Sequence, residues 1–356
     1  MASERNAEAS ERELRTGPPP QTVLLRLMWG RTMSCLLETT IRLGLADQLG
    51  DGEGKAEEVA ARCGTRPEPT VRMLRALTAL ELLTEVRPGV FRLTPAGALL
   101  RSDHPEGMAS MIRFFTFPAM VDAWEHLEDS LRTGRPAFDA LVGHDYFTHL
   151  REHPELSADF NRAMSQATRA TADVLALHYD FGRYGTVVDV GGGDGTLLAG
   201  ILARHPSPRG ILYDSPEGLA QAAARMERAG LSGRCALETG DFFVSAPAGG
   251  DLYLLKSVLH DWDDDRCADI LGGIRRVVPA DGRLLIVEPV LPALADPGGG
   301  SAHHYLSDLT MMVGLGGRER TAEDFEELCA RSGFSVTAVT ALPEPSTFAI
   351  VEAEPV

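Results

Sequence analysis

The sequence predicts an α/β protein in which a doubly wound sheet follows a mostly helical N-terminal region that contains a winged-helix unit. From Thr186 onward, short apolar runs alternate with helical stretches, which is typical of a sheet covered by helices on both faces. Before that point apolar residues recur at helical spacing, and residues 51–103 predict two short helices followed by a β-hairpin. A chain of 356 residues has room for more than one folded unit.

Composition narrows the classes of function. The formal net charge of −17 gives a surface that repels nucleic acid and anionic membranes, so we expect neither as a partner. No apolar run approaches the roughly 20 residues that span a bilayer, and residues 1–20 lack the apolar core of a secretory signal. The five cysteines are scattered and include no CxxC pair, which favours a reducing cytoplasm over a disulfide framework or zinc site.

The first of four predicted segments is a flexible tail over residues 1–20. Residues 21–103 form the second, in which amphipathic helices precede the winged-helix unit. Residues 37–103 carry nine Lys/Arg and ten Asp/Glu, a local net charge of −1, whereas a DNA-binding unit would carry a basic face. A scaffold or dimerisation role is therefore favoured, and a winged-helix regulator that senses a ligand stays open as an alternative.

The third segment, residues 104–183, is predicted to be helical and is rich in large apolar side chains. These side chains either pack in a core or line a pocket for a flat, apolar ligand, because Met adapts to irregular shapes and aromatic rings stack. The side chains concerned are Met108, Met111, Phe114, Phe115, Phe117, Met120 and Trp124. The sheet domain, residues 184–356, then begins near Tyr184.

A glycine-rich turn follows the first predicted strand of that domain. Residues 187–190 run directly into Gly191-Gly-Gly193-Asp-Gly195, and a helix follows. Glycines there let the backbone turn sharply and approach a ligand closely at the carboxyl edge of the strand. The pattern is neither the GxGxxG of nicotinamide enzymes nor a P-loop, which would need a lysine for a triphosphate.

Acidic residues end the next two strands. Asp214 lies 23 residues after Gly191, where a carboxylate can accept hydrogen bonds from both hydroxyls of a ribose. The Asp241 carboxylate can accept a hydrogen bond from the exocyclic amine of an adenine, and the side chain of Phe242 can pack on the face of a ring. Each acidic residue alone could be a cap or turn residue. Because three strand ends in register carry suitable groups, the sequence predicts a nucleoside site.

Several longer motifs carry a resemblance to a known family. VVDVGGGDGT, ILYD, GDFF, LKSVLHDWDDD, LLIVEPVLP and GGRERTAEDFEELCARSGF together resemble S-adenosylmethionine-dependent small-molecule O-methyltransferases, both the plant caffeic acid type and those of actinobacterial secondary metabolism. The resemblance covers nearly the whole chain after about residue 20. It implies a Rossmann-like class I methyltransferase fold, a winged-helix dimerisation domain, a homodimer, and S-adenosyl-L-methionine as cofactor. It also implies that the cofactor is contacted by Gly191, Gly193, Asp214, Asp241, Phe242, Lys256 and Ser257.

His260 is the predicted catalytic base. It follows the fourth strand at the edge where α/β folds place active sites, although a histidine chosen at random is more often structural. The resemblance implies that it takes the proton of the acceptor hydroxyl and that Glu288 and Glu319 flank and orient it. A phenol of pKa about 10 facing a histidine of about 6.5 implies an uphill transfer of roughly 5 kcal/mol, which neighbouring carboxylates reduce.

No metal is expected. Asp263, Asp264 and Asp265 form an acidic run, but carboxylates at the start of a predicted helix cap its free N–H groups. Trp262 is expected to pack beneath the site as a structural residue.

The resemblance also places a set of side chains at the acceptor. These are Met164, His304, Asp308, Met311 and Met312. Asp261 is assigned to the acceptor as well, with bracing of the loop or the base as its alternative role. Residues 303–315 are expected to form a helix after a glycine-rich linker at 295–302, with one of the paired methionines in the core. The favoured acceptor is a phenolic or polyketide-like metabolite, and departures from the plant pattern in residues 104–150 leave its identity open. Carbon or nitrogen methylation remains an alternative.

Overall fold

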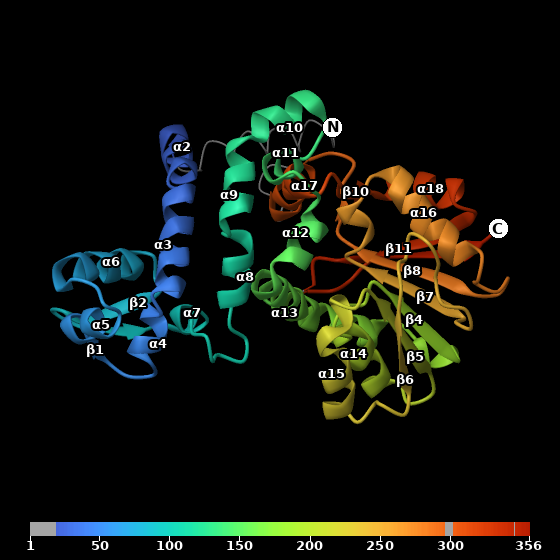
Figure 1. The fold of residues 1–356 in the computed structure, drawn as a ribbon, viewed down its shortest axis with the longest axis horizontal. Helices are drawn as coiled ribbons and strands as arrows, with labels where there is room; N and C mark the ends of the chain where they lie inside the picture. Colours follow the sequence, from blue (N-terminus) through green and yellow to red (C-terminus); the bar gives the residue numbers. More distant parts are fainter. Residues whose placement is uncertain (1–18, 296–301, 345) are drawn as a thin grey trace, which may run out of the picture. The chain divides into compact units, whose positions relative to one another are not determined.

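A computed structural model describes residues 19–295, 302–344 and 346–356 of the chain (Figure 1). The chain divides between Thr116 and Phe117 into two compact units. The predicted tail and the glycine-rich linker lie almost entirely outside the described residues. Within the described residues, no helix is both long enough and apolar enough to cross a membrane.

The first unit holds the predicted pair of helices and hairpin. Its elements are α2 (Pro20–Met28), α3 (Gly30–Arg42), α4 (Leu45–Leu49), β1 (Gly54–Lys55), α5 (Ala56–Arg62), α6 (Pro67–Ala79), β2 (Leu83–Arg87), β3 (Val90–Leu93), α7 (Pro95–Ala98) and α8 (Ala109–Phe115). The three strands form an antiparallel sheet in the order β1-β3-β2. The two helices, α5 and α6, precede the β2–β3 hairpin, as the sequence predicts.

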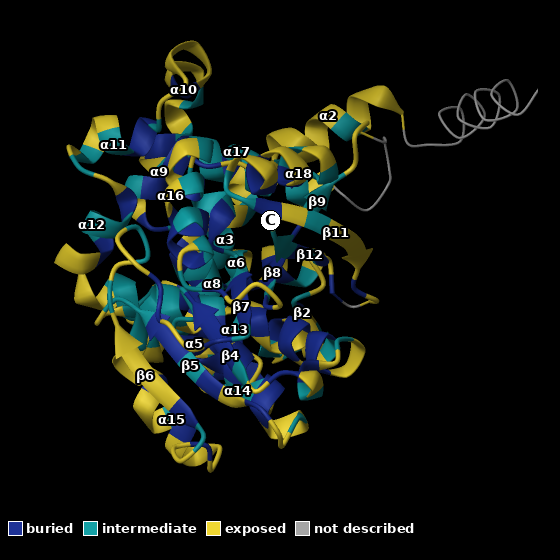
Figure 2. Cartoon of the chain, turned by 90° about the vertical axis from the view of Figure 1, so that its right-hand side faces the viewer, coloured by how far each residue is buried: buried dark blue, intermediate teal, exposed yellow. Residues whose placement is uncertain are grey.

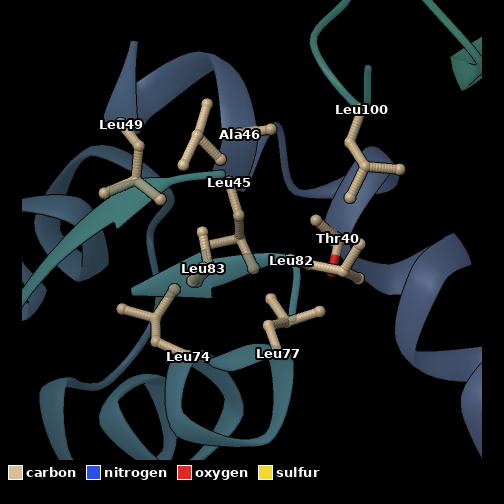
Figure 3. Close-up of a pocket in the computed structure, with 10 residues that line it drawn as sticks. Thr40, Leu45, Ala46, Leu49, Leu74, Leu77, Leu82, Leu83 and Leu100 are labelled. Atoms are coloured by element: carbon tan, nitrogen blue, oxygen red, sulfur yellow. The ribbon is translucent and has the colours of Figure 1, made fainter. Parts of the chain in front are cut away.

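A small pocket in this unit is lined by leucines and belongs to its core (Figure 3). Leu45, Leu74 and Leu77, from α4 and α6, are almost fully buried around it. The hydroxyl of Thr40 is the one polar side chain in the lining, and it donates to the Leu36 carbonyl at 2.8 Å within its own helix. No lining side chain is left to orient a polar ligand, so the pocket is a packing feature.

The second unit begins with helices and continues into the sheet. The helices before the sheet are α9 (Pro118–Glu125), α10 (Leu127–Thr133), α11 (Ala137–Val142), α12 (Tyr146–Glu152), α13 (Pro154–His178) and η1 (Phe181–Arg183). The sheet strands are β4 (Thr186–Val190), β5 (Arg209–Asp214), β6 (Cys235–Thr239), β7 (Leu252–Lys256), β8 (Arg283–Glu288), β11 (Phe334–Ala341) and β12 (Ala349–Pro355). The elements between the strands are α14 (Thr196–Arg204), η2 (Gly218–Gln221), α15 (Ala222–Arg228), η3 (Leu259–Asp261), α16 (Asp264–Arg275), β9 (Val290–Leu291), α17 (Ala302–Gly314), β10 (Arg320–Thr321) and α18 (Ala322–Arg331).

The sheet is doubly wound, as predicted, with the strand order β11-β12-β8-β7-β4-β5-β6. Strands β4 to β8 pair in parallel, and β12 pairs antiparallel with both of its neighbours. Helices α13, α14 and α15 cover one face, and α16 and α18 cover the other (Figure 1). The central strands are buried and β6 is an exposed edge (Figure 2).

Alternating side chains explain why these strands carry continuous apolar runs. In β4, Val187 packs with the helices of one face and Val188 with those of the other, and in β8 Leu285 and Leu284 are divided in the same way. A strand that is buried on both faces needs apolar residues at every position.

The topology of the sheet determines where the functional loops lie. The chain runs outward from β4 to β5 and β6, then returns to β7 on the other side of β4, so a switch point lies between β4 and β7. Ligands of open α/β sheets bind at the carboxyl ends of strands beside such a point. In addition, β9 pairs in parallel with β10, with Val290 opposite Arg320. This pairing brings the chain after β8 beside the chain after α17.

Candidate active site

The glycine-rich turn after β4 has the backbone that only glycine adopts readily. Gly191, Gly193 and Gly195 have φ angles of 71°, 57° and 78°. A Cβ at Gly191 would lie 2.8 Å from a methyl group of Val258, whereas a Cβ at Gly193 would meet nothing within 4 Å. The turn is therefore closely packed at its start and open beside Gly193.

Asp214, at the end of β5, is already bonded to this turn. One carboxylate oxygen accepts the backbone N–H of Gly193 at 2.8 Å, and the other accepts that of Ser215 at 2.6 Å. Burial raises the pKa of Asp214, and the two amide donors oppose that shift. Each carboxylate oxygen keeps a second acceptor site for a ligand hydroxyl. Two residues predicted from separate strand ends thus meet.

Asp194, inside the turn, is a contact point that sequence reasoning missed. Its carboxylate accepts the N–H and the hydroxyl of Thr196 at 3.0 and 2.7 Å, and it also bonds Ser165 of α13 and Arg225 of α15. The turn is therefore tied to two helices. No local sequence motif predicts these contacts, since Ser165 and Arg225 lie 29 and 31 residues from Asp194 in the chain.

Asp241 and Phe242 follow β6. The Asp241 carboxylate accepts the N–H of Phe243 at 2.9 Å, and the side chain is exposed. The Phe242 ring lies beside the glycine turn, with one ring carbon 3.7 Å from where a Cβ of Gly191 would stand. The structure thus brings Phe242 to the turn, while Asp241 makes the local bond of a turn residue.

Lys256 ends β7, and Ser257 follows it. The Lys256 ammonium lies 3.3 Å from the Thr168 hydroxyl and 4.7 Å from the centre of the Phe348 ring. Burial lowers the pKa of Lys256 to about 8, against the opposing effect of Glu288. Ser257 has a φ of 53°, a left-handed conformation that residues other than glycine rarely adopt. Such backbone strain clusters at functional sites.

Asp189 was also missed from the sequence. It is a buried residue of β4, and one of its carboxylate oxygens has no hydrogen-bond partner among the described residues. Burial raises its pKa to about 7, and the nearby Asp214 adds to that shift. A carboxylate in a strand that is otherwise apolar is the signal that could have found it.

The predicted base and its two carboxylates meet in one cluster. His260 lies in η3, directly after β7, with its side chain 16% exposed. Its Nδ1 is 3.1 Å from Glu319 Oε1 and 3.6 Å from Glu288 Oε2. Its Nε2 is 3.5 Å from Asp261 Oδ1. When the ring is neutral, a proton on Nδ1 facing Glu319 leaves the lone pair on Nε2.

Both carboxylates are themselves held in place. Glu288 Oε1 accepts the backbone N–H groups of Val258 and Leu259, each at 3.0 Å. Glu319 Oε1 accepts the Ser307 hydroxyl at 2.8 Å. The pairing of β9 with β10 explains why two residues so distant in sequence lie together.

The electrostatics of the cluster favour the imidazolium. Burial alone would lower the pKa of His260, but the carboxylates of Glu288, Asp261 and Glu319 outweigh burial and raise it to about 10. Burial also raises the pKa of Asp261 to about 7, although the imidazolium opposes this shift. The pKa of Glu319 is lowered: burial would raise it, and the hydrogen bond and charge of His260 prevail. The site is thus built to hold a proton on the imidazole.

The acidic run after Trp262 is used for helix capping and ion pairs. Asp263 caps α16, accepting the N–H of Arg266 at 2.8 Å, as predicted. Asp264 pairs with Arg318 and Arg320, and Asp265 pairs with Arg331. Within the described residues, the geometry that could admit a cation is instead that of His260, Glu288 and Glu319, whose ligand atoms lie within 4.8 Å of one another.

The predicted acceptor residues lie on two helices and the base turn. Met164 is on α13, Asp261 is beside the base, and His304, Asp308, Met311 and Met312 are on α17. All six are half-buried. The expectation that one of the paired methionines is a core residue is wrong, because the buried positions of α17 are Thr310, Val313 and Gly314.

Asp308 has a role that its predicted assignment did not include. Its carboxylate accepts the backbone N–H of Glu319 at 2.9 Å, so it braces the residue that orients the base. His304 Nε2 and the Tyr305 hydroxyl are buried and make no hydrogen bond with the described residues. Unsatisfied polar atoms of this kind are candidates for contact with a ligand.

Aromatic side chains surround the turn that carries the base. Trp262 stacks on Phe147 of α12 with ring centres 5.2 Å apart and meets the edge of Phe243 at 4.7 Å. The packing role expected for Trp262 is therefore observed, and Phe147 is a neighbour that the sequence did not reveal. Among the predicted apolar residues, Phe117 and Met120 are buried in the second unit.

Comparisons with known proteins agree with this geometry. Residues 124–335 match the O-methyltransferase domain family, and residues 25–103 match the O-methyltransferase dimerisation domain. The chain is 48% identical over 340 residues to the O-demethylpuromycin-O-methyltransferase of Streptomyces alboniger, covering 94% of this chain and 89% of that protein.

Solved structures show the same fold. The crystal structure of LaPhzM has a TM-score of 0.89 at 40% identity, covering 95% of this chain and all of the other. An O-methyltransferase from neocarzinostatin biosynthesis, solved with S-adenosylmethionine and 2-hydroxy-5-methyl naphthoic acid, has a TM-score of 0.78 at 32% identity, covering 91% of this chain and 96% of the other.

Proposed function

This chain belongs to the O-methyltransferase family, and on that premise we propose that it methylates a hydroxyl of a small phenolic or polyketide-like acceptor with His260 as the general base. It is an S-adenosylmethionine-dependent methyltransferase. The observation that carries the proposal is the cluster of His260, Glu319 and Glu288 at the carboxyl end of β7, beside the glycine turn.

The residues around the glycine turn fit a nucleoside cofactor. The open space beside Gly193, the carboxylate of Asp214 and the ring of Phe242 provide a close backbone approach, a hydroxyl acceptor and an apolar face. We assign the cofactor to these groups together with Gly191, Asp241, Lys256 and Ser257. When bound, S-adenosylmethionine supplies an electrophilic methyl group on a positively charged sulfur.

His260 Nε2 accepts the proton of the acceptor hydroxyl in this proposal. Glu319 holds Nδ1, and Glu288 and Asp261 stabilise the imidazolium that results. The raised pKa of His260, about 10, approaches that of a phenol, so proton transfer from the acceptor to the neutral imidazole is nearly balanced. The cost then lies in forming that neutral imidazole, which is the minor form below a pH of about 10. Positioning then contributes most of the remaining acceleration.

The acceptor side is proposed to consist of flat apolar and adaptable side chains. Met164, Met311 and Met312 would contact the acceptor, and His304 and Asp308 offer polar groups beside them. Similarity to relatives whose names specify aromatic compounds supports an aromatic acceptor. A role in secondary metabolism, such as antibiotic biosynthesis, is part of the same proposal.

We further propose catalysis without a metal, a homodimer and a cytoplasmic location, with neither nucleic acid nor membrane as a partner. The hydrogen bonds that Glu288 and Glu319 already make support a proton-transfer role for the cluster. The match to a dimerisation domain supports the dimer, and five unpaired cysteines suit a reducing compartment.

We retain the four-segment division with boundaries near residues 20, 103 and 183. Light scattering, and turnover in the presence of EDTA, test the dimer and the absence of a metal.

The central test pairs a screen with a variant. Candidate phenols are incubated with methyl-labelled S-adenosylmethionine, and NMR of the product identifies the methylated atom. Transfer to oxygen supports the proposal, and transfer to carbon or nitrogen contradicts it. In His260→Ala, turnover should fall about 10²- to 10⁴-fold while calorimetry shows unchanged cofactor binding. His178→Ala, at the exposed end of α13, is the matched control.

A further inference from the structure

We propose that Arg320 is a positioning residue for the catalytic base: its buried guanidinium fixes the backbone turn that carries His260. The inference rests on the proposed function, since it assigns a partner to the base named there. Arg320 is one residue beyond Glu319 and is 1% exposed, among the largest fully buried side chains described. A buried guanidinium needs charged and hydrogen-bonded partners.

The partners of Arg320 are the two carbonyl groups that enclose the base. Nη1 donates to the carbonyl of Leu259 at 2.8 Å, and Nη2 donates to that of Trp262 at 3.0 Å. Between these carbonyls lie only His260 and Asp261. The planar guanidinium holds its donors in a fixed fork, so it fixes the distance between the two ends of the turn.

Asp264 keeps the guanidinium in place. Its Oδ1 accepts from Nη2 at 2.7 Å and from Nε at 3.1 Å. Asp264 begins α16, so the turn is connected through Arg320 to the start of a helix packed on the sheet. Charge-assisted bonds of this kind are shorter and stronger than neutral ones.

The turn is held from its other side as well. Glu288 Oε1 accepts the N–H groups of Val258 and Leu259, so carbonyl groups and N–H groups of the turn are bound by different residues. Gly317 packs directly on the turn: a Cβ there would collide with the His260 carbonyl and lie 2.5 Å from the Trp262 nitrogen. The segment 316–320 therefore holds both the backbone and the imidazole of the base.

The two contacts are mechanically linked. Glu319 orients the imidazole and Arg320 fixes its backbone, and these residues are adjacent in the chain where it enters β10. Any displacement of Arg320 therefore changes the distance between Glu319 and His260. A misplacement of about 1 Å can lower a rate by roughly 10²-fold. The expected effect falls on proton transfer and leaves cofactor binding alone.

The test uses Arg320→Lys in the full-length enzyme. Lysine keeps the charge but cannot bond both carbonyls and Asp264 in one plane. We expect kcat to fall about 10- to 100-fold. The KM for the cofactor should stay within about threefold, and the pH at which activity rises should move downward because the Glu319 contact weakens. Arg331→Lys is the matched control, since Arg331 pairs with Asp265 of the same helix α16 but is 49% exposed and makes no hydrogen bond to the turn.

The possible outcomes are distinguishable. Wild-type kcat and pH profile in a folded Arg320→Lys would overturn the inference, as would a loss confined to cofactor binding. If Arg320→Lys fails to fold, Asp264→Asn provides the test, because this variant retains Arg320 but weakens the ion pair that anchors it. We expect a smaller fall in kcat with a pH shift in the same direction. Wild-type kinetics in Asp264→Asn would refute the positioning role of Arg320. Normal turnover in His260→Ala would instead refute the proposed function, whatever Arg320→Lys does.

Discussion

The turn that carries the base and the helix that faces the proposed acceptor differ in how their polar groups are used. Around residues 258–262, backbone N–H groups and carbonyls are bound by Glu288 and Arg320. Along α17, His304 Nε2 and the Tyr305 hydroxyl are buried without a hydrogen-bond partner among the described residues. The backbone of the first region is thus bound by protein side chains, although one oxygen each of Glu288 and Glu319 has no hydrogen-bond partner among the described residues, and the second region presents groups that a ligand could satisfy.

This difference indicates which substitutions should alter the rate of proton transfer and which should alter the binding of the acceptor. A change in the base turn should lower turnover for every acceptor, because it alters proton transfer and leaves the binding of the ring unaffected. A change on α17 should alter the KM of one acceptor more than that of another. The following predictions test that separation, from the largest expected effect to the smallest.

Activity should rise steeply with pH. The carboxylates around His260 raise its pKa to about 10, so the fraction of unprotonated base grows about tenfold per pH unit between pH 7 and 9. Initial rates of kcat/KM over this range measure the effect. In His260→Ala only the ionisation of the acceptor itself should remain. A flat profile in the wild type would contradict the account of the base.

The same pKa shift has the opposite effect on stability. A pKa that is higher in the folded protein than in the unfolded chain means that the imidazolium stabilises the fold fully below pH about 6.5, and that this contribution is lost as pH rises toward 10. Thermal unfolding at several pH values should show this loss in the wild type and less of it in His260→Ala.

Gly317→Ala should lower kcat by roughly 100-fold and also reduce the Tm, because the added Cβ collides with the backbone of the base turn. The matched control is Gly272→Ala in α16, where the nearest atom to a new Cβ is the end of the Arg276 side chain at 3.8 Å. The control should be neutral or slightly stabilising. Equal effects of the two substitutions would show that the turn tolerates displacement.

Glu319→Gln should lower kcat about tenfold and move the alkaline rise to lower pH, since one of the charges that raise the pKa of His260 is removed. Glu326→Gln, an exposed position of α18, serves as the control. If the rise stays at its original pH, Glu319 does not set the pKa of the base.

Met311→Ala and Met312→Ala should raise the KM of the acceptor by only a few-fold and leave kcat and cofactor binding close to wild type, because each removes apolar contact alone. The effect should differ between acceptors of different shape. Leu306→Ala, 60% exposed on the same helix, is the control. A fall in kcat that is equal for all acceptors would remove the distinction between the two regions.

Local motifs made one part of the site predictable. Gly191 and His260 follow strands and Asp214 ends one, and a parallel sheet brings the carboxyl ends of its strands to one edge. By contrast, the bonds of Arg320 to Leu259 and of Asp308 to Glu319 N–H depend on how separate segments pack. Nothing in the local sequence specifies such pairs.

The fold shows the same division. The buried strands were recognisable because they are continuously apolar. β11 was not, since Ser and Thr interrupt its apolar residues and most of the strand is exposed beside β12. The burial of α17 was misjudged at its methionines, because apolar character alone does not tell which face of a short helix meets the core.

Single-turnover rates for acceptors of graded acidity test the central claim most directly. Ring-fluorinated analogues of one phenolic acceptor, spanning several pKa units at similar size, are compared in the wild type and in His260→Ala at fixed pH with saturating cofactor. The account predicts rates that depend weakly on acceptor pKa in the wild type, where His260 removes the proton, and steeply in the variant, which can use only phenolate already ionised in solution. Equal dependence in the two proteins would contradict it.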